Sequence, residues 1–170
     1  ISYILQNNQI ALDTPPVNQS NVELWADKAV AMGMPSWTID GSDPAAWHSS
    51  VACAREFSMS GGGPTLIHVE TMRGCGHAHH HDDLYLGAPS GTPPGYVDRE
   101  LLSYWEAKDP IPTHRELLIS LGISEDELEE MEAEEGDLVD AAREHVESMD
   151  WADPKTCLLY TSPSPRDSDT

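Results

Sequence analysis

The sequence predicts an α/β fold with a parallel sheet, followed by a helical extension. Three short apolar segments alternate with two segments of helical periodicity, and this order is typical of parallel crossover units. Three further helical segments come after a loop at 71–98 that is rich in Gly, His, Asp and Pro. We therefore expect an α/β domain at 1–85, a loop and helical extension at 86–152, and a disordered tail at 153–170.

The three expected strands are short and apolar. Residues 2–5 have the pattern of a buried strand, which ends at Asn7-Asn8. Residues 37–39 form the second expected strand, and residues 65–70 are apolar enough to lie inside a sheet. The order of the segments predicts that all three strands run parallel.

Two helices are expected between these strands. The first is predicted to begin at a capping box of Ser20 and Glu23 and to end at Gly33. The second is predicted to begin at Asp43, with Pro44 at its first position, and to end at glycines 61–63. The apolar stripes expected to face the core are Val22, Trp25, Ala26, Ala29 and Val30 in the first helix and Trp47, Val51, Ala54 and Phe57 in the second.

Three helices are expected in the extension, at about 98–108, 112–121 and 124–150. The last begins with a capping box of Ser124 and Glu127, and Gly136 is expected to weaken its middle. Its expected apolar face consists of Leu128, Met131, Leu138, Ala142, Val146 and Met149.

The start of the sequence suggests a piece of a longer chain, and its end suggests a tail outside the fold. The first residue is Ile, and an apolar strand follows at once. Residues 161–170 have no apolar periodicity, and residues 157–167 resemble the translated adaptor sequence that trails some metagenomic reading frames. We expect this tail to belong neither to the fold nor to the function; a solvated natural tail is the alternative.

The charge excludes several classes of partner. Nine Lys and Arg against thirty Asp and Glu give a net charge of −21, which argues against binding to nucleic acid or to an anionic membrane surface. Thirteen of the acids lie between Glu125 and Asp150 and form either a solvated helix face or an acidic docking face. No apolar stretch is long enough to span a membrane. Three widely spaced cysteines favour a reducing cytoplasm.

Two polar segments could carry chemistry. The first is Asn7-Asn8, at the carboxyl end of the first strand, where open α/β sheets bind ligands. An Asn oxygen there suits Mg²⁺ or Ca²⁺ together with a main-chain carbonyl and phosphate oxygens, although two amides after a strand also form ordinary turns.

The second segment, residues 73–83, contains Arg73, four His and two Asp. Its His and Asp side chains could hold Zn²⁺ or Ni²⁺, or the segment could be a solvated loop. A third possibility is that Arg and His meet an anionic cofactor, with His also handling protons near neutral pH.

Taken together, these segments resemble the alpha subunits of the thiamine-diphosphate-dependent 2-oxo acid dehydrogenases. Residues 6–15, Gln-Asn-Asn-Gln-Ile-Ala-Leu-Asp-Thr-Pro, resemble the second half of that family's cofactor motif. The later features agree in order and spacing over about residues 1–152. They are Ala-Asp-Lys-Ala at 26–29, Met-Gly-Met-Pro at 32–35, Asp-Gly-x-Asp at 40–43, Gly-Pro-Thr-Leu-Ile at 63–67, Glu70-Thr71, Arg73, Gly76-His77, the acidic pair and Tyr-Trp-Glu-Ala-Lys-Asp-Pro-Ile at 104–111.

The resemblance implies the carboxyl-terminal half of a thiamine-diphosphate-binding fold. It further implies oxidative decarboxylation of a 2-oxo acid such as pyruvate, a branched-chain keto acid or acetoin, with acyl transfer to lipoamide. The implied cofactors are thiamine diphosphate and Mg²⁺. The implied partners are a beta subunit in an α₂β₂ assembly and a lipoyl-bearing acyltransferase, and the fragment alone is expected to be inactive.

The resemblance also assigns roles to individual residues. Asn8 would give its side-chain oxygen and Ile10 its main-chain carbonyl to Mg²⁺. Arg73 would order the loop that meets the cofactor, and His77 would contact the diphosphate and assist acyl transfer. A Gly-Asp-Gly that supplies another Mg²⁺ ligand is expected upstream of Ile1.

The chain departs from the family pattern within the loop. Ala78 stands where better-known members have a phosphorylatable Ser, so kinase control at that position is not expected. The three histidines that follow shift the acidic pair by one residue, so His79 could take the role of His77.

Two competing functions remain at this point. One is a noncatalytic metal-binding or interaction module that uses the His-rich loop and the acidic helix. The other is a different thiamine enzyme, such as a transketolase-like half, in which residues 104–111 would have no role.

Overall fold

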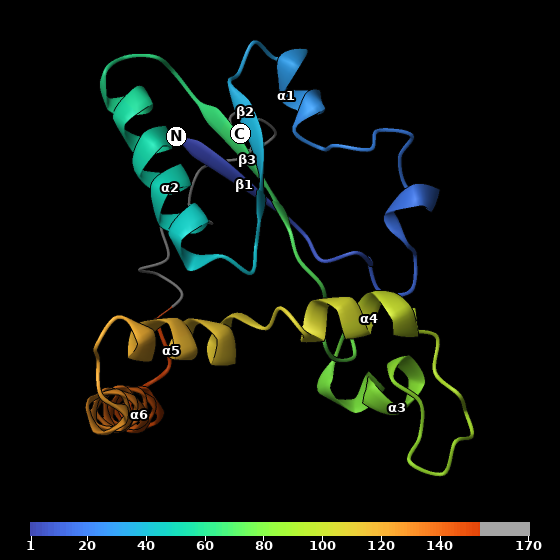
Figure 1. The fold of residues 1–170 in the computed structure, drawn as a ribbon, viewed down its shortest axis with the longest axis vertical. Coiled ribbons are helices and arrows are strands. Elements are labelled where there is room, and N and C mark those ends of the chain that lie inside the picture. The colour runs from blue at the N-terminus through green and yellow to red at the C-terminus, as the bar shows by residue number, and fades with distance from the viewer. Residues whose placement is uncertain (154–170) are drawn as a thin grey trace, which may run out of the picture. The chain divides into compact units, whose positions relative to one another are not determined.

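The computed structural model describes residues 1–153, so the predicted adaptor-like tail at 157–167 lies outside the described residues (Figure 1). The chain divides into two compact units, residues 1–120 and residues 121–170, which are described separately below. The predicted boundary after residue 85 stays a prediction.

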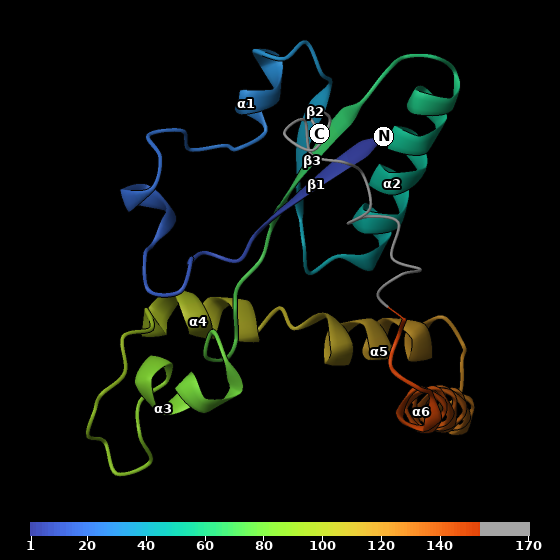
Figure 2. The same ribbon diagram turned by 180° about the vertical axis from the view of Figure 1, so that it is seen from behind.

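The first unit contains a three-stranded parallel sheet, as the sequence predicts. Its strands are β1 (Ser2–Asn7), β2 (Ser36–Asp40) and β3 (Thr65–Glu70), in the order β1-β3-β2 (Figures 1 and 2). Asn7 and Asp40 both pair in register with Glu70. The carboxyl ends of the three strands therefore meet at one edge, which is where such sheets bind ligands.

The strands differ in burial, and the prediction of a buried first strand is wrong. Ile67, His68 and Val69 of β3 are fully buried, whereas Tyr3 and Ile4 of β1 are 52% and 50% exposed. The reason is position, because β3 lies between two strands and β1 lies at an edge of the sheet.

The first predicted helix is much shorter than expected. Ser20 accepts a hydrogen bond from the main-chain N–H of Val22, at 3.1 Å, instead of capping a helix. Such local bonds from Ser compete with helix formation. The chain contains a short 3₁₀ turn, η1 (Pro16–Asn18), and a single helical turn, α1 (Asp27–Val30).

Only part of the predicted stripe on this segment is buried. Ala26 and Ala29 are buried, as expected, but Val30 is 71% exposed. Gly33 ends the segment with a φ of +69°, as predicted from its conformational freedom.

The second predicted helix is confirmed as α2 (Pro44–Met59). Asp43 caps it by accepting bonds from the N–H groups of Ala45 and Ala46, at 2.9 and 3.2 Å. Of the predicted core residues, Trp47 and Ala54 pack into the sheet core, whereas Val51 is 43% exposed and was wrongly assigned.

The first unit has two separate apolar cores. The sheet core consists of Ala54, Ile67 and Val69, with Trp37, Ile39 and Trp47 packed against them. The loop core consists of Tyr85, Val97 and Leu102, with Ile10, Met72 and Leu86 packed against them.

Short helices order much of the long loop at 71–98. They are η2 (His79–His81) and α3 (Asp82–Tyr85), and α4 (Arg99–Glu106) follows with Asp98 as its cap. The first unit ends with α5 (Pro110–Ser120), which begins two residues earlier than predicted.

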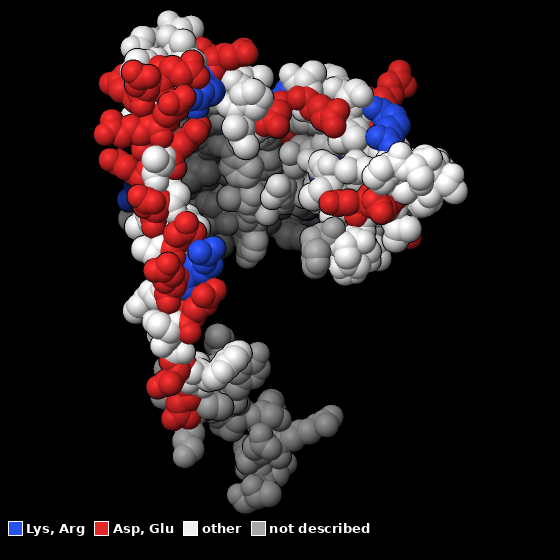
Figure 3. All heavy atoms as spheres, turned by 90° about the horizontal axis from the view of Figure 1, so that it is seen from below, with Lys and Arg blue, Asp and Glu red and all other residues white. Residues whose placement is uncertain are grey.

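The second unit is dominated by α6 (Glu125–Ser148), which has the predicted capping box and runs unbroken through Gly136. Acidic side chains cover it along its length (Figure 3). The predicted burial of its apolar face is wrong except at Leu128, because Met131, Leu138, Val146 and Met149 are each more than half exposed.

Within residues 1–153, no helix has both the length and the apolar character needed to cross a membrane.

Candidate functional site

The Asn-Asn segment forms a tight turn directly after β1. The side-chain oxygen of Asn7 accepts from the N–H of Gln9 at 3.2 Å, and that of Asn8 accepts from the N–H of Ile10 at 3.3 Å. Gln9 has a φ of +69°, an uncommon conformation for a residue other than Gly. The turn thereby brings Asn8 and Ile10 together, and both line one cavity of about 200 Å³.

The segment after β3 runs beside this turn. The N–H of Thr71 donates to the carbonyl of Asn7 at 3.0 Å, and the N–H of Arg73 donates to that of Asn8 at 3.1 Å. These bonds extend the pairing of β1 with β3 beyond both strands. Arg73 and Asn8, which are 65 positions apart in the sequence, are therefore direct neighbours through their main chains.

The Arg73 side chain holds the loop together. Its Nη2 donates to the carbonyl of Leu12 at 3.0 Å, and its guanidinium lies 4.4 Å from the centre of the Tyr85 ring. The Tyr85 hydroxyl donates to the carbonyl of Arg73 at 2.8 Å, and the Tyr96 hydroxyl donates to that of Leu12 at 3.0 Å. Burial raises the pKa of Tyr85, against the opposing effect of Arg73. This contact set fits the predicted ordering role of Arg73.

Two nitrogens of Arg73, Nε and Nη1, are buried and make no hydrogen bond to the described part of the chain. A buried guanidinium donor without an acceptor is costly, so these two groups suit an anionic acceptor.

His77 is exposed and does not line the cavity shared by Asn8 and Ile10. Next to it, the N–H of Gly76 donates to Oδ1 of Asp82 at 2.6 Å, which links the two ends of the segment 77–81. A Cβ atom at position 76 would lie 2.6 Å from the main chain of His81, so only Gly fits there. The choice between His77 and His79 stays a prediction.

The described side chains of the His-rich loop do not form a metal cluster. Among the side chains that the structure describes, no three His, Cys, Asp or Glu groups come close enough to hold a metal ion. His80 and His81 contact each other edge to face, with ring centres 4.2 Å apart.

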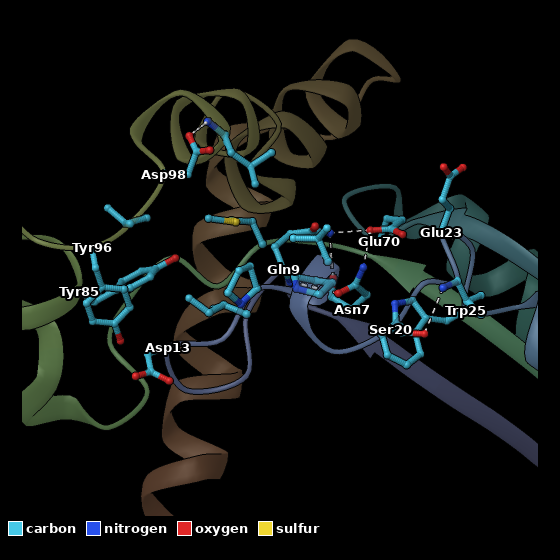
Figure 4. Close-up of a pocket in the computed structure, with 18 of the residues that line it drawn as sticks. Asn7, Gln9, Asp13, Ser20, Glu23, Trp25, Glu70, Tyr85, Tyr96 and Asp98 are labelled. Atoms are coloured by element: carbon cyan, nitrogen blue, oxygen red, sulfur yellow. Dashed lines mark hydrogen bonds between the residues drawn. The ribbon is translucent and has the colours of Figure 1, made fainter.

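A larger cavity of about 780 Å³ lies beside the turn (Figure 4). None of the described residues that line it is Lys or Arg. Its lining contains four carboxylates and three aromatic side chains, which are Asp13, Glu23, Glu70, Asp98, Trp25, Tyr85 and Tyr96. The cavity by itself therefore does not neutralise an anion, so a diphosphate at this edge needs a cation or Arg73.

Glu70 is the functional candidate that sequence reasoning did not single out for chemistry. Its Oε2 accepts from the side-chain amides of Asn7 and Gln9, at 3.0 and 2.5 Å (Figure 4). Its Oε1 lies 3.1 Å from Nε2 of His68. The signal was present in the sequence, because the ends of parallel strands share an edge and Glu70 is the last residue of β3.

His68 lies beneath this carboxylate and is fully buried. Its Nδ1 is 3.1 Å from the hydroxyl of Thr38, but the contact of Nε2 with Glu70 does not have hydrogen-bond geometry. Burial lowers the pKa of His68, with the charge of Glu70 opposing the shift.

A second polar contact ties Lys108, just beyond the end of α4, to the same edge of the sheet. Lys108 bonds to the carboxylate of Asp40, the last residue of β2, and lies 4.7 Å from the centre of the Trp105 ring. Burial raises the pKa of Asp40, but hydrogen bonds from Lys108 and Ser42 outweigh this and lower it overall. The bond to Asp40 raises the pKa of Lys108.

Comparisons with known proteins find related sequences. The chain is 35% identical over 144 residues to the pyruvate dehydrogenase E1 component subunit alpha of Bacillus subtilis, covering 85% of this chain and 35% of that protein. It is 38% identical over 133 residues to the protein of the same name from Bacillus cereus, covering 78% of this chain and 33% of that protein. It is also 30% identical over 161 residues to the 2-oxoisovalerate dehydrogenase subunit alpha of Bacillus subtilis, covering 94% of this chain and 46% of that protein.

This chain thus spans between a third and a half of the length of these relatives. Residues 1–155 match the family model of the dehydrogenase E1 component, a family with a thiamine-diphosphate-binding fold. The match and the parallel sheet confirm the predicted fold class, and the family implies the use of thiamine diphosphate. The chain therefore belongs to the dehydrogenase E1 component family, as its motifs predicted.

Proposed function

We propose that this chain is part of the alpha subunit of a 2-oxo acid dehydrogenase, which decarboxylates a 2-oxo acid oxidatively and transfers the acyl group to lipoamide. The observation that carries the proposal is the turn at 7–10, held beside Arg73 at the carboxyl edge of a parallel sheet. The family membership and the names of the relatives support the same activity.

The residues of the turn fit a magnesium diphosphate. The Asn8 side-chain oxygen and the Ile10 carbonyl are neutral oxygen ligands of the kind that Mg²⁺ prefers, and the turn holds them close together. The unpartnered Nε and Nη1 of Arg73 could donate to the anionic cofactor. When bound, thiamine diphosphate supplies the carbanion chemistry of the decarboxylation.

His77 would contact the diphosphate and handle a proton during acyl transfer. Its exposure leaves the imidazole accessible to a cofactor and to a second protein. The bond between Gly76 and Asp82 restricts the loop on either side of it, which favours a defined position for the ring.

The partners follow from the same assignment. We infer a beta subunit in an α₂β₂ assembly, a lipoyl-bearing acyltransferase, and a 2-oxo acid substrate of the pyruvate or branched-chain type. Two relatives are named as alpha subunits of pyruvate and 2-oxoisovalerate dehydrogenases, which agrees with this range. Cys53 and Cys75 are free thiols, which agrees with the proposed cytoplasmic location.

The test uses the full-length protein assembled with its beta subunit. His77→Ala should lower acyl transfer to lipoamide by about a hundredfold or more, because a positioned acid–base group contributes roughly that much. The midpoint of thermal unfolding should hardly change, since His77 is exposed. The rate is measured with a lipoyl domain as acceptor.

Two further variants sharpen this test. His48→Ala removes an exposed histidine on α2 and should leave the rate unchanged. His79→Ala decides between the two loop histidines, since a loss confined to that variant would move the role there. Wild-type acyl transfer in both His77→Ala and His79→Ala would contradict the proposed role of the loop.

A further inference from the structure

We propose that Glu70 is a positioning residue for the cofactor turn, which we define as Asn7–Ile10. Its carboxylate holds the two amide side chains on either side of Asn8, so that the oxygens of Asn8 and Ile10 are presented in a fixed arrangement. The inference rests on the proposed function only for the identity of what the turn binds.

The geometry converges on one oxygen. Oε2 of Glu70 accepts from Nδ2 of Asn7 at 3.0 Å and from Nε2 of Gln9 at 2.5 Å. Both donors come from the turn, whereas Glu70 comes from the neighbouring strand. A carboxylate is suited to this place because it only accepts, so both amides can donate to it at once.

The turn needs such support because its backbone is unusual. Gln9, between Asn8 and Ile10, has a φ of +69°, a conformation that side-chain-bearing residues rarely adopt. The main-chain N–H groups of Thr71 and Arg73, just after Glu70, donate to the carbonyls of Asn7 and Asn8. The turn is thus held against the end of β3 both by these main-chain bonds and by the side chain of Glu70.

His68 lies against the carboxylate on the inner side of the protein and limits the space open to it. It is fully buried, and its Nδ1 is 3.1 Å from the Thr38 hydroxyl. Its Nε2 lies 3.1 Å from Oε1 of Glu70 and has no other polar partner in the described chain. Glu70 itself is only 28% exposed, so its side chain has little room to turn away.

The hydrogen bonds of the Glu70 carboxylate go to Asn7 and Gln9 and not to Asn8, so it acts on Asn8 through these two neighbours. Removing such a supporting contact typically weakens metal binding by 10- to 100-fold, as for the residues that orient metal ligands elsewhere.

The test measures metal binding directly. The full-length protein, assembled with its beta subunit, is titrated with Mn²⁺ in the presence of saturating thiamine diphosphate, and bound Mn²⁺ is followed by electron paramagnetic resonance. In Glu70→Gln the dissociation constant should rise by about tenfold, because a neutral amide oxygen accepts more weakly from the two donors than a carboxylate oxygen does. The kcat at saturating Mg²⁺ should change less than twofold.

A control and a double-mutant cycle separate positioning from general damage. Glu56→Gln removes an exposed carboxylate on α2 and should leave the dissociation constant unchanged. Gln9→Met removes one donor and should also weaken Mn²⁺ binding. If the two residues act through the same bond, the combined variant should lose less than the product of the two single losses.

The outcomes are distinguishable. An unchanged dissociation constant in folded Glu70→Gln overturns the inference, as does a fully multiplicative double mutant. If Glu70→Gln does not fold, the Gln9→Met variant tests the inference by itself. Wild-type Mn²⁺ binding in Gln9→Met would then overturn the inference. If the wild-type protein binds no Mn²⁺ with thiamine diphosphate, the proposed function fails first.

Discussion

The two apolar cores of the first unit are built in different ways. The sheet core consists of aliphatic and Trp side chains from regular strands and one helix. The loop core brings together single residues from the cofactor turn, the loop and α4. The side chains of Tyr85, Tyr96 and Arg73 donate hydrogen bonds to main-chain carbonyls beside it. The fold therefore depends on apolar burial, whereas the site depends on polar bonds between distant segments.

Removing a buried side chain from the sheet core should give the largest loss of stability. Ile67→Ala in the assembled full-length protein should cost about 3 kcal/mol, because it removes a fully buried side chain and leaves a cavity. The midpoint of thermal unfolding should fall clearly, whereas Mn²⁺ affinity below that midpoint should stay unchanged. Ile111→Ala, at a residue that is 78% exposed, is the control and should shift the midpoint very little. Equal midpoints in the two variants would refute the assigned core.

A smaller and more local effect is expected in the loop core. Tyr85→Phe keeps the ring but loses the bond from its hydroxyl to the carbonyl of Arg73, at a cost of about 1 kcal/mol. Limited proteolysis within residues 74–98 should therefore become several-fold faster under native conditions. Tyr3→Phe removes a hydroxyl from a residue that is 52% exposed and should not change the cleavage rate. Loop cleavage at the wild-type rate in Tyr85→Phe would show that the bond does not order the loop.

The smallest effect is expected at the pair of Lys108 and Asp40. Both side chains are partly exposed, so Lys108→Met should cost only on the order of 0.5 kcal/mol near pH 7. The pKa of Asp40 is lowered from 3.8, so its contribution is present above about pH 4 and is lost as pH falls through its folded value. The difference in unfolding midpoint between wild type and Lys108→Met should therefore shrink between pH 5 and pH 3.

Lys28→Met is the matched control for this pH series. Lys28 lies over the ring of Trp25, at 4.1 Å, much as Lys108 lies over Trp105. Within the described residues Lys28 forms no ion pair with a carboxylate, so for Lys28→Met the difference in unfolding midpoint from wild type should not shrink between pH 5 and pH 3. If the difference in unfolding midpoint between wild type and Lys108→Met stayed constant down to pH 3, this would contradict the assigned ion pair.

Local patterns predicted the regular elements well. A continuous apolar run predicts β3, and a capping residue followed by Pro predicts α2. Each of these signals is contained within a few consecutive residues. Ser20 failed as a predicted cap because the same side chain can close a local turn. Burial of β1 and α6 was overestimated, because apolar periodicity shows which face could be covered but not whether a neighbour covers it.

The site was predicted only in part for the same reason. The motif at 6–15 predicts the family and points to Asn8 and Ile10 as candidate ligands. The structure brings these two residues together. The roles of Asn8, Ile10, Arg73 and His77 toward the cofactor stay predictions. Glu70 and Tyr85 were missed because their importance lies in bonds to Asn7 and Arg73, and no local pattern reports such distant pairings.

The exposed edge of the sheet has a practical consequence for anyone who isolates this polypeptide. Within residues 1–153, β1 pairs only with β3, so its other side presents unsatisfied main-chain donors and acceptors. Ser2–Asn7 contains no Lys or Pro, the residues that normally discourage strands of separate molecules from joining. When this polypeptide is produced alone, it should therefore tend to self-associate through β1. Co-expression with a partner chain is the better route to soluble protein.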